Sequence, residues 1–187
     1  MVDDFRTFLS VLEARGKLTR INREVDPRFE LPAVLKHLAR RGQAAFFERV
    51  KGSGLPVVSN IMGTRDMLAL AFGTSPENVV QKWIEGTNHP IEPIVVPSGV
   101  VKEVVKIGEA ASVDELPLVT HCARDAGPYI TAGVVIARDP ETGRRNVSIN
   151  RMMYRSARET GIRMMPPQHL GLIQEKAERL GRPLGER

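Results

Sequence analysis

The sequence is poor in cysteine and has no long apolar run. Cys122 is the only cysteine among 187 residues, which excludes an internal disulfide and a metal site built from several cysteines. A single cysteine fits a reducing cytosol and is more often a small buried residue than a nucleophile. No apolar run approaches the ~20 residues that a membrane-spanning helix needs. The acidic start, Met1 to Asp4, also lacks the apolar core of a signal peptide. We therefore expect a cytoplasmic protein without a membrane span.

Aromatic residues and clustered charge are also scarce. Aromatic side chains make up 5% of the residues, too few for an extended base-stacking surface. The net charge of +5 favours an anionic partner, such as phosphate, carboxylate or nucleic acid. However, the basic residues form only the pairs Arg40-Arg41 and Arg144-Arg145, with no longer run. This spread argues against nucleic-acid binding, and a basic nucleic-acid-binding domain is kept only as a third alternative.

The first half of the sequence alternates helical and strand patterns. With 42% hydrophobic and 26% charged residues, the composition is that of an ordinary globular protein. The pattern predicts a first helix after Asp3 and Asp4, which ends at Gly16 and has Phe5, Phe8, Leu9 and Leu12 at helical spacing. The elements predicted after it are a strand at Leu18–Val25, a helix at Leu31–Ala39 closed near Gly42, buried strands at 45–47 and 56–58, and helices at Arg65–Phe72 and Asn78–Ile84. This alternation predicts a small α/β layer, which we place in residues 1–98.

The second half, residues 99–187, follows a connector punctuated by prolines. Its clearest feature is a hairpin, with strands at Tyr129–Ala137 and Arg144–Met153 joined by the turn Asp139–Gly143. A helix at Leu170–Leu180 follows and is stopped by Gly181. Its apolar side is expected to consist of Leu172, Ile173, Ala177 and Leu180. The fold class is thus mixed α/β (α+β).

Polar groups of different chemistry gather on this hairpin and at the start of the following helix. They are the hydroxyl of Thr131, the amide of Asn146, the guanidinium of Arg151 and the imidazole of His169. Arginine forms forked hydrogen bonds to carboxylate or phosphate, and Asn and His offer donors to divalent ions. The helix start at Gln168 also offers backbone N–H groups to a phosphate. Each residue has a local alternative: turn hydrogen bonds for Asn146, solvation for Arg151 and a helix cap for His169.

The spacing of Asn146 and Arg151 is awkward for a single pocket. Residues of opposite parity in a regular strand point to opposite faces, and these two differ by five. A shared pocket therefore requires a bulge or a strand that twists out at Asn150.

Four blocks of this region resemble the flavin-binding segment of the UbiD-like decarboxylases. The blocks, in order, are Asp125-Ala126-Gly127-Pro128-Tyr129-Ile130-Thr131, Asp139-Pro140-Glu141-Thr142-Gly143, Asn146-Val147-Ser148-Ile149-Asn150-Arg151 and Pro167-Gln168-His169. Their order and separations are similar to the family pattern. The Asp4-Phe5-Arg6 helix start and Pro117-Leu118 are also similar to the start of the family, so the resemblance covers essentially the whole chain.

The resemblance implies roles for particular residues. Asn146 and His169 match ligands of a divalent metal, manganese or magnesium, which bridges to the cofactor phosphate. Arg151 matches the arginine of a Glu-Arg-Glu catalytic network beside the flavin and the substrate carboxylate. Positions that line the cofactor are matched by Thr131, Ser148, Ile149, Arg151, Gln168 and His169.

The resemblance also implies a function and partners. The cofactor would be prenylated FMN, supplied by a flavin prenyltransferase, with a potassium site near its phosphate whose ligands we do not assign. The reaction would be the reversible, non-oxidative decarboxylation of an aromatic or α,β-unsaturated acid, and the second domain would be part of a split β-barrel. The alternative is a non-catalytic flavin- or phosphate-binding subunit or assembly partner.

Family members are longer than this chain. The remaining metal-ligating glutamate, both network glutamates and the substrate-covering domain would lie beyond it, because Glu175, Glu178 and Glu186 match none of those positions. We therefore expect a truncated chain, a proteolytic fragment, half of a split enzyme or a stand-alone domain, inactive alone. We further expect an unpaired sheet edge, exposed apolar surface, and either a homo-oligomer or a second chain that carries the missing part.

Overall fold

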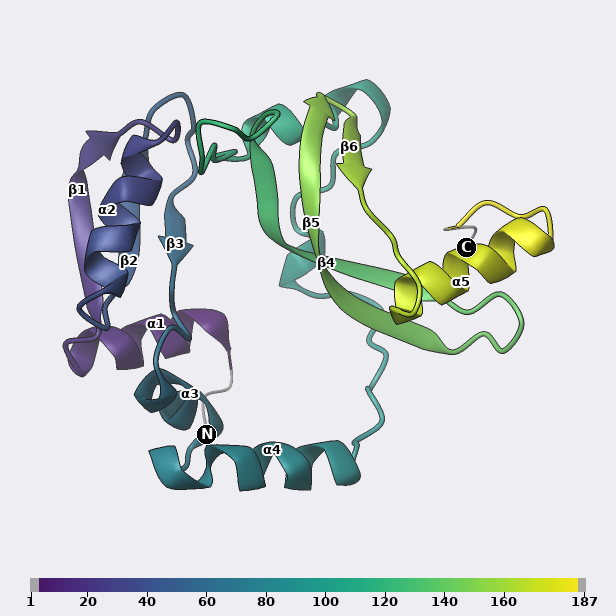
Figure 1. Ribbon diagram of the computed structural model, residues 1–187, viewed down its shortest axis with the longest axis horizontal. Coiled ribbons are helices and arrows are strands. Elements are labelled where there is room, and N and C mark those ends of the chain that lie inside the picture. Colours follow the sequence, from purple (N-terminus) through teal and green to yellow (C-terminus); the bar gives the residue numbers. More distant parts are fainter. Residues whose placement is uncertain (1–3, 185–187) are drawn as a thin grey trace. The chain divides into compact units, whose positions relative to one another are not determined.

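The computed structural model describes residues 4–184, and their contacts divide the chain into two units, one ending at Pro117 and the other beginning at Leu118. The boundary expected after residue 98 therefore falls inside the connector of the first unit. In chain order the elements are α1 (Phe5–Ala14), β1 (Leu18–Val25), α2 (Glu30–Ala39), β2 (Ala44–Val50), β3 (Val57–Ser59), α3 (Arg65–Phe72), the 3-10 helix η1 (Pro76–Asn78), α4 (Val79–Asn88), the 3-10 helices η2 (Val100–Lys102), η3 (Gly108–Ala110) and η4 (Val113–Glu115), β4 (Tyr129–Arg138), β5 (Arg145–Ser156), β6 (Glu159–Ile162) and α5 (His169–Arg179) (Figure 1).

The first unit is the predicted α/β layer. Its sheet has the order β1-β2-β3, with β1 and β2 parallel and β3 antiparallel to β2. Helix α2 connects the two parallel strands, as a parallel pair requires. Strand β1 and helix α3 have the predicted bounds, whereas α4 continues past the expected end at Ile84. In this extra turn the hydroxyl of Thr87 bonds back to the carbonyl oxygens of Trp83 and Ile84.

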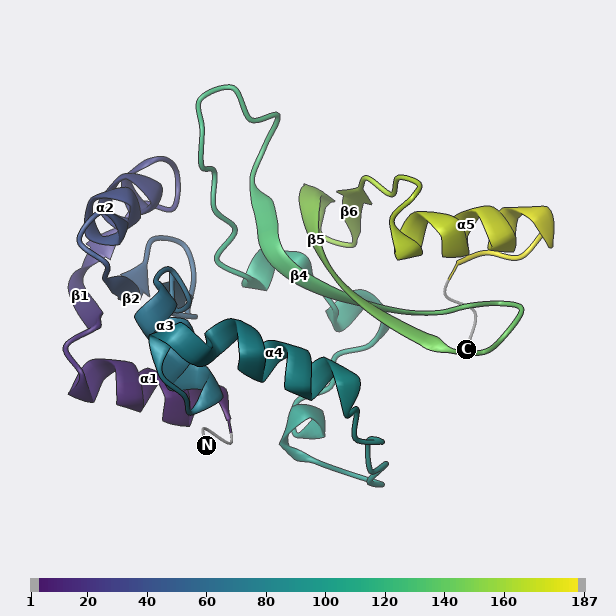
Figure 2. The same cartoon turned by 60° about the horizontal axis from the view of Figure 1, so that its bottom comes forward.

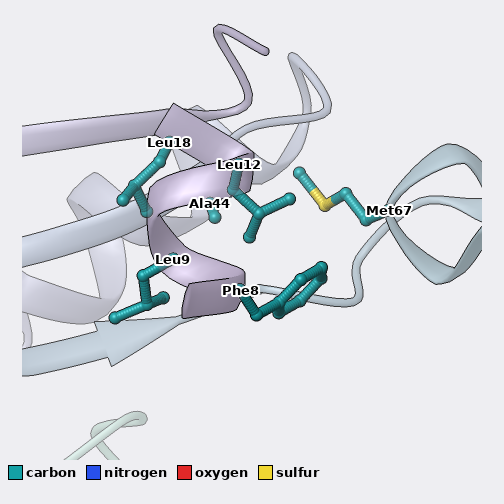
Figure 3. Packing of buried hydrophobic residues seen from close by; sticks show 6 residues of the cluster. All are labelled: Phe8, Leu9, Leu12, Leu18, Ala44 and Met67. Carbon is teal, nitrogen blue, oxygen red and sulfur yellow. The ribbon is translucent and has the colours of Figure 1, made fainter. Parts of the chain in front are cut away.

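Helix α1 supplies much of the core of this unit. Asp4 caps it by accepting a hydrogen bond from the backbone N–H of Thr7, and Gly16 follows its end with a φ of 63°. The predicted helical face is buried at three positions, but Phe5 is exposed; Asp3 lies outside the described residues. The buried cluster consists of Phe8, Leu9, Leu12, Leu18, Ala44 and Met67 (Figure 3).

The second unit contains the predicted hairpin and one strand more. Its sheet has the order β4-β5-β6, and both strand pairs are antiparallel. The turn between β4 and β5 is closed by Asp139, whose Oδ1 accepts from the backbone N–H groups of Glu141 and Thr142. Strand β6 was not predicted from the sequence. Only Ala157 and Arg158 separate it from β5, and neither is typical of a two-residue hairpin turn.

A β-bulge interrupts the β4–β5 ladder. Ile130 pairs with Met152 and Gly133 pairs with Asn150, so two residues of β4, Thr131 and Ala132, lie opposite Arg151 alone. The predicted irregularity is therefore present, but the extra residue belongs to β4 and not to β5.

Helix α5 lies beside the β4–β5 hairpin in both views (Figures 1 and 2). Its buried face consists of Leu170, Ile173 and Ala177, and Leu170 and Ile173 pack in a cluster with Ala137 of β4. The expected apolar face is corrected here, because Leu172 and Leu180 are exposed. Gly171 allows the first turn to lie close: a Cβ there would come within 2.5 Å of the backbone carbonyl carbon of Met165.

An ion pair also holds α5 to the hairpin. Lys176 of α5 donates to Oδ2 of Asp139 at 2.6 Å and lies 3.2 Å from a carboxylate oxygen of Glu141. The Lys176 ammonium group, together with the backbone N–H groups of Thr142 and Glu141, lowers the pKa of Asp139 from 3.8 to about 2. The two carboxylates in turn raise the pKa of Lys176. The same aspartate thus shapes the turn and fastens the helix.

The surface carries exposed apolar side chains, as expected. Val134 and Ile136 of β4 face Ile149 and Val147 of β5, and all four are more than half exposed. Among the described strands, β4 pairs along its length with β5 only. Cys122 is exposed, in contrast to the usual burial of a lone cysteine. Within residues 4–184, no helix combines the length and the apolarity needed to cross a bilayer.

Replacing Leu12 by alanine tests the packing of the first unit. Leu12 is fully buried, so Leu12→Ala should lower the free energy of unfolding by about 2–5 kcal/mol. Trp83, the only tryptophan, stacks on Phe72 in this unit and reports urea unfolding through its fluorescence. The matched control is Leu55→Ala at a 47% exposed position, where the change should stay within ~0.5 kcal/mol. Equal effects of the two substitutions would contradict the assigned core.

The Asp139–Lys176 pair predicts a specific acid sensitivity of α5. Because the pKa of Asp139 is depressed in the folded protein, its contribution is complete above the ordinary value of 3.8 and is lost as the pH falls towards about 2. The protection of α5 amides from hydrogen exchange, expressed relative to the intrinsic exchange rate at each pH, should therefore fall over this window. In Asp139→Asn the acid-dependent step should disappear, with faster exchange already at neutral pH. An identical pH profile in both proteins would refute this attachment.

Candidate functional site

Asn146 and His169 line the same pocket of the second unit. The pocket has a volume of about 330 Å³ and lies between the hairpin and the first turns of α5. Asn146 is the second residue of β5, and His169 is the first residue of α5. The remaining lining residues are Asp139, Thr142, Arg144, Arg145, Val147, Leu172, Ile173 and Lys176. The structure therefore brings together the two predicted metal ligands, which are 23 positions apart in the sequence.

The amide of Asn146 has an unused hydrogen-bonding group. Its Nδ2 atom is buried and has no hydrogen-bond partner, which is costly for a polar atom. A 180° rotation about the last side-chain bond exchanges Nδ2 and Oδ1 with little change in shape, so an acceptor oxygen can occupy the same position. A divalent ion or a ligand oxygen in the pocket would give this amide a partner.

The other charged groups of the pocket are mostly cationic. Arg144, Arg145 and Lys176 line it, against one carboxylate, Asp139. Both oxygens of that carboxylate are engaged, Oδ1 with the backbone of the turn and Oδ2 with Lys176. Asp139 is therefore not a free third metal ligand, and no cluster of three or more His, Cys, Asp or Glu residues suited to a metal occurs within residues 4–184. The excess of positive charge favours an anionic ligand.

The start of α5 lies at this pocket, because its first residue, His169, lines it. Gln168 occupies the N-cap position, and its side chain makes no capping hydrogen bond to the helix. The first N–H groups of a helix have no partner within the helix, and they point towards ligands placed at its start. His169 and these N–H groups consequently face the same end of α5.

Arg151 lies at a different place, beside the bulge. Its side chain is exposed, and its guanidinium carbon lies 5.6 Å from the centroid of the Tyr129 ring. Thr131, also exposed, is one of the two bulge residues opposite Arg151. Within the described residues, Arg151 forms no ion pair, so its charge is available to a ligand.

The remaining predicted cofactor residues lie on both faces of β5. Ser148 is half-buried, and its hydroxyl accepts a hydrogen bond from the side chain of Asn150 at 2.8 Å. Ile149 is 76% exposed on the opposite face, together with Arg151. Burial alternates without a break from Arg145 to Arg151, which places Asn146 on the half-buried face.

A single pocket shared by Asn146 and Arg151 is therefore wrong. The bulge in β4 does not change the alternation within β5, so the two side chains leave opposite faces of the strand. Five residues of extended chain also separate them by ~17 Å along the strand. The candidate residues therefore fall into two groups, one at the Asn146–His169 pocket and one at the bulge with Arg151 and Thr131.

Sequence reasoning missed two contributors to this geometry. Lys176 holds α5 against the turn through Asp139, a residue 37 positions away, and no local pattern signals such a pair. Tyr129 lies under Arg151, where the sequence suggested only a strand residue. The register of the hairpin is the signal that could have found this contact. Tyr129 pairs with Met153, two residues from Arg151 on β5, so a hairpin prediction with the correct bulge brings the two side chains together.

Comparison with known protein families assigns both halves of the chain. Residues 9–87 match the N-terminal domain of 3-octaprenyl-4-hydroxybenzoate carboxy-lyase, and residues 94–185 match its Rift-related domain. Among curated proteins, anhydromevalonate phosphate decarboxylase of Methanothermobacter thermautotrophicus is 36% identical over 161 residues, covering 86% of this chain and 36% of the relative.

Solved structures show the same fold. The UbiD-class enzyme HmfF from Pelotomaculum thermopropionicum, in complex with FMN, matches with a TM-score of 0.89 and 41% identity, covering 96% of this chain and 40% of that one. An evolved dimeric form of HmfF in complex with prenylated FMN (prFMN) has the same TM-score and 42% identity, covering 96% of this chain and 42% of that one. Vanillic acid decarboxylase of Sedimentibacter hydroxybenzoicus matches with a TM-score of 0.88 and 31% identity, covering 98% and 42%. The chain thus spans about 40% of the length of the proteins it matches. With both of its halves matched in order, the chain belongs to the UbiD family of carboxy-lyases.

Proposed function

We propose that this chain forms the cofactor-binding part of a UbiD decarboxylase that removes carboxylate from an aromatic or α,β-unsaturated acid. The observation that carries the proposal is the pocket lined by both Asn146, whose Nδ2 is buried without a partner, and His169, the first residue of α5. Family membership and the flavin complexes of HmfF support the same assignment.

The residues of the pocket fit a metal-bridged phosphate. Asn146 would offer Oδ1 and His169 a ring nitrogen to Mn²⁺ or Mg²⁺, while Arg144, Arg145 and the first N–H groups of α5 face negative charge. Asp139 is engaged elsewhere, so further ligands have to come from the phosphate, water or residues outside this chain. We propose prenylated FMN as the cofactor, with its phosphate in the Asn146–His169 pocket. We also propose a potassium ion near the phosphate, but we assign no ligands to it.

The other end of the site would hold the reacting groups. Arg151, which has no ion pair within the described residues, would bind the substrate carboxylate through a forked hydrogen bond, and Tyr129 would keep the guanidinium oriented. Thr131, Ser148, Ile149 and Gln168 would also contact the cofactor, some of them through backbone groups, because Ser148 and Ile149 lie on opposite faces of β5. The prenylated flavin, when bound, would supply the electron sink that decarboxylation requires.

The chain spans only about 40% of the length of its relatives, so we expect other protein segments to complete the active site. Because relatives are about two and a half times as long, we propose that the glutamates of the catalytic network and the missing strands of a split β-barrel come from the rest of the polypeptide or from a second chain. A flavin prenyltransferase would supply the cofactor. We also propose a homo-oligomer; one UbiD-class relative has been solved in an evolved dimeric form.

Substitution of the pocket residues tests the metal assignment. In full-length protein, Asn146→Ala and His169→Ala should each weaken Mn²⁺ binding by at least ~10-fold, measured by equilibrium dialysis, because each removes a ligand. FMN retention should fall together with the metal. The matched controls are Asn22→Ala on β1 and His37→Ala on α2, both exposed residues of the first unit. Unchanged Mn²⁺ affinity in both pocket variants would eliminate the metal site.

Substitution of Arg151 tests the catalytic end. In full-length protein co-expressed with a flavin prenyltransferase, Arg151→Ala should reduce kcat/KM for CO₂ release by about 100-fold or more, with fold and metal content kept. Arg151→Lys should also be impaired, because lysine cannot form the bidentate contact. Arg155→Ala, four residues along the same strand, is the control.

The same assay separates the two candidate functions. A wild-type protein that binds the cofactor but releases no CO₂ from any aromatic or unsaturated acid would favour the non-catalytic subunit. Wild-type turnover in Arg151→Ala would remove the role assigned to this arginine.

A further inference from the structure

A second pocket lies next to the hairpin turn in the second unit. It has a volume of about 480 Å³ and is formed by the ends of β4 and β5 and by the segment that follows α5. Its charged lining consists of Arg138, Arg145, Arg182 and Asp139, and neither Asn146 nor His169 contributes to it. It is therefore separate from the proposed metal pocket, although Asp139 and Arg145 line both.

Two of these arginines oppose each other directly. Arg138 and Arg145 are cross-strand partners at the end of the β4–β5 ladder, where like charges destabilise a sheet. Arg182, three residues beyond the end of α5, also lines this pocket. Arg138 donates to the backbone carbonyl of Gly143, which leaves its charge uncompensated. Within residues 4–184, none of the three forms an ion pair.

The nearby carboxylates are already used by α5. Asp139 is paired with Lys176, and Glu141 with Lys176 and Arg179. The carboxylates of the hairpin turn are therefore paired with cations of α5, while the guanidinium groups of Arg138, Arg145 and Arg182 form no ion pair within residues 4–184. All three side chains are exposed, so solvent and salt screen their mutual repulsion, and a bound anion would reduce it most at low ionic strength.

We propose that this pocket binds the phosphate group of a small molecule. Guanidinium groups match phosphate oxygens in fixed, forked geometry, and three of them suit a dianion better than a single carboxylate. Ile136, Pro183 and Leu184 form an apolar wall, and the volume exceeds that of a phosphate alone, so the pocket has room for an organic substituent. Arg138 and Arg182 lie outside the metal pocket, whereas Arg145 lines both pockets, so the substitutions that test this site are made at Arg138 and Arg182.

Titration with inorganic phosphate tests this site. Calorimetry at low ionic strength, with EDTA present so that no metal ion holds phosphate at His169, should give saturable binding to the chain. Arg138→Gln and Arg182→Gln should each weaken it by about tenfold or more, because each removes a charged donor. Arg179→Gln is the matched control: it is ion-paired with Glu141, does not line the pocket and should leave the affinity unchanged.

The melting temperature provides a second readout, because Arg138→Gln should weaken phosphate binding but stabilise the protein when phosphate is absent. Without phosphate at low salt, Arg138→Gln should raise the Tm, because it removes the repulsion with Arg145, and it should reduce the further rise that phosphate causes in the wild type. Absence of saturable binding at millimolar phosphate would overturn the proposal. So would binding that survives both arginine substitutions, or binding that is lost in Asn146→Ala and kept in Arg138→Gln. Tighter binding of acetate than of phosphate would contradict the assigned ligand class.

Discussion

The attachment of α5 to the β4–β5 hairpin is the interaction on which the candidate site depends. Leu170 and Ile173 pack against Ala137, and Lys176 closes the contact through Asp139. The Lys176–Asp139 ion pair makes this contact specific, because it fixes which turn of α5 lies against the hairpin. His169, at the first position of α5, is thereby held beside Asn146 at the start of β5. Without this attachment the two donors would belong to unconnected segments.

The regular alternation of β5 divides the site into two ends. Asn146 lies on the half-buried face towards α5, while Arg151 lies on the exposed face at the bulge made by Thr131 and Ala132. An elongated cofactor with a phosphate at one end and a reactive ring at the other is the kind of ligand that would occupy both. At the hairpin turn, Asp139 and Glu141 are paired with the cations of α5. Arg138 and Arg145, at the ends of β4 and β5, are left without an ion pair among the described residues.

Local signals allowed most elements to be predicted from the sequence. Asp4 and Gly16 delimit α1, Gly181 follows α5, and the turn at Asp139 sets the β4–β5 hairpin. Strand β6 was missed because the residues that connect it, Ala157 and Arg158, carry no turn signal. The metal pair was predicted through family resemblance, whereas its pocket depends on contacts between residues far apart in sequence. The odd separation of Asn146 and Arg151 along the strand correctly indicated that their side chains point to opposite faces. The hydrophobic periodicity of the sequence, however, could not show that the bulge lies in β4.

The most direct test of the two-ended site is a crystal structure of the full-length protein with Mn²⁺ and FMN, in which anomalous scattering locates the metal. The account predicts Mn²⁺ bound by Oδ1 of Asn146 and a ring nitrogen of His169, with the phosphate at the start of α5 and the flavin ring beside Arg151. A metal ion bound away from Asn146 and His169, or a flavin ring in the Asn146–His169 pocket, would contradict it.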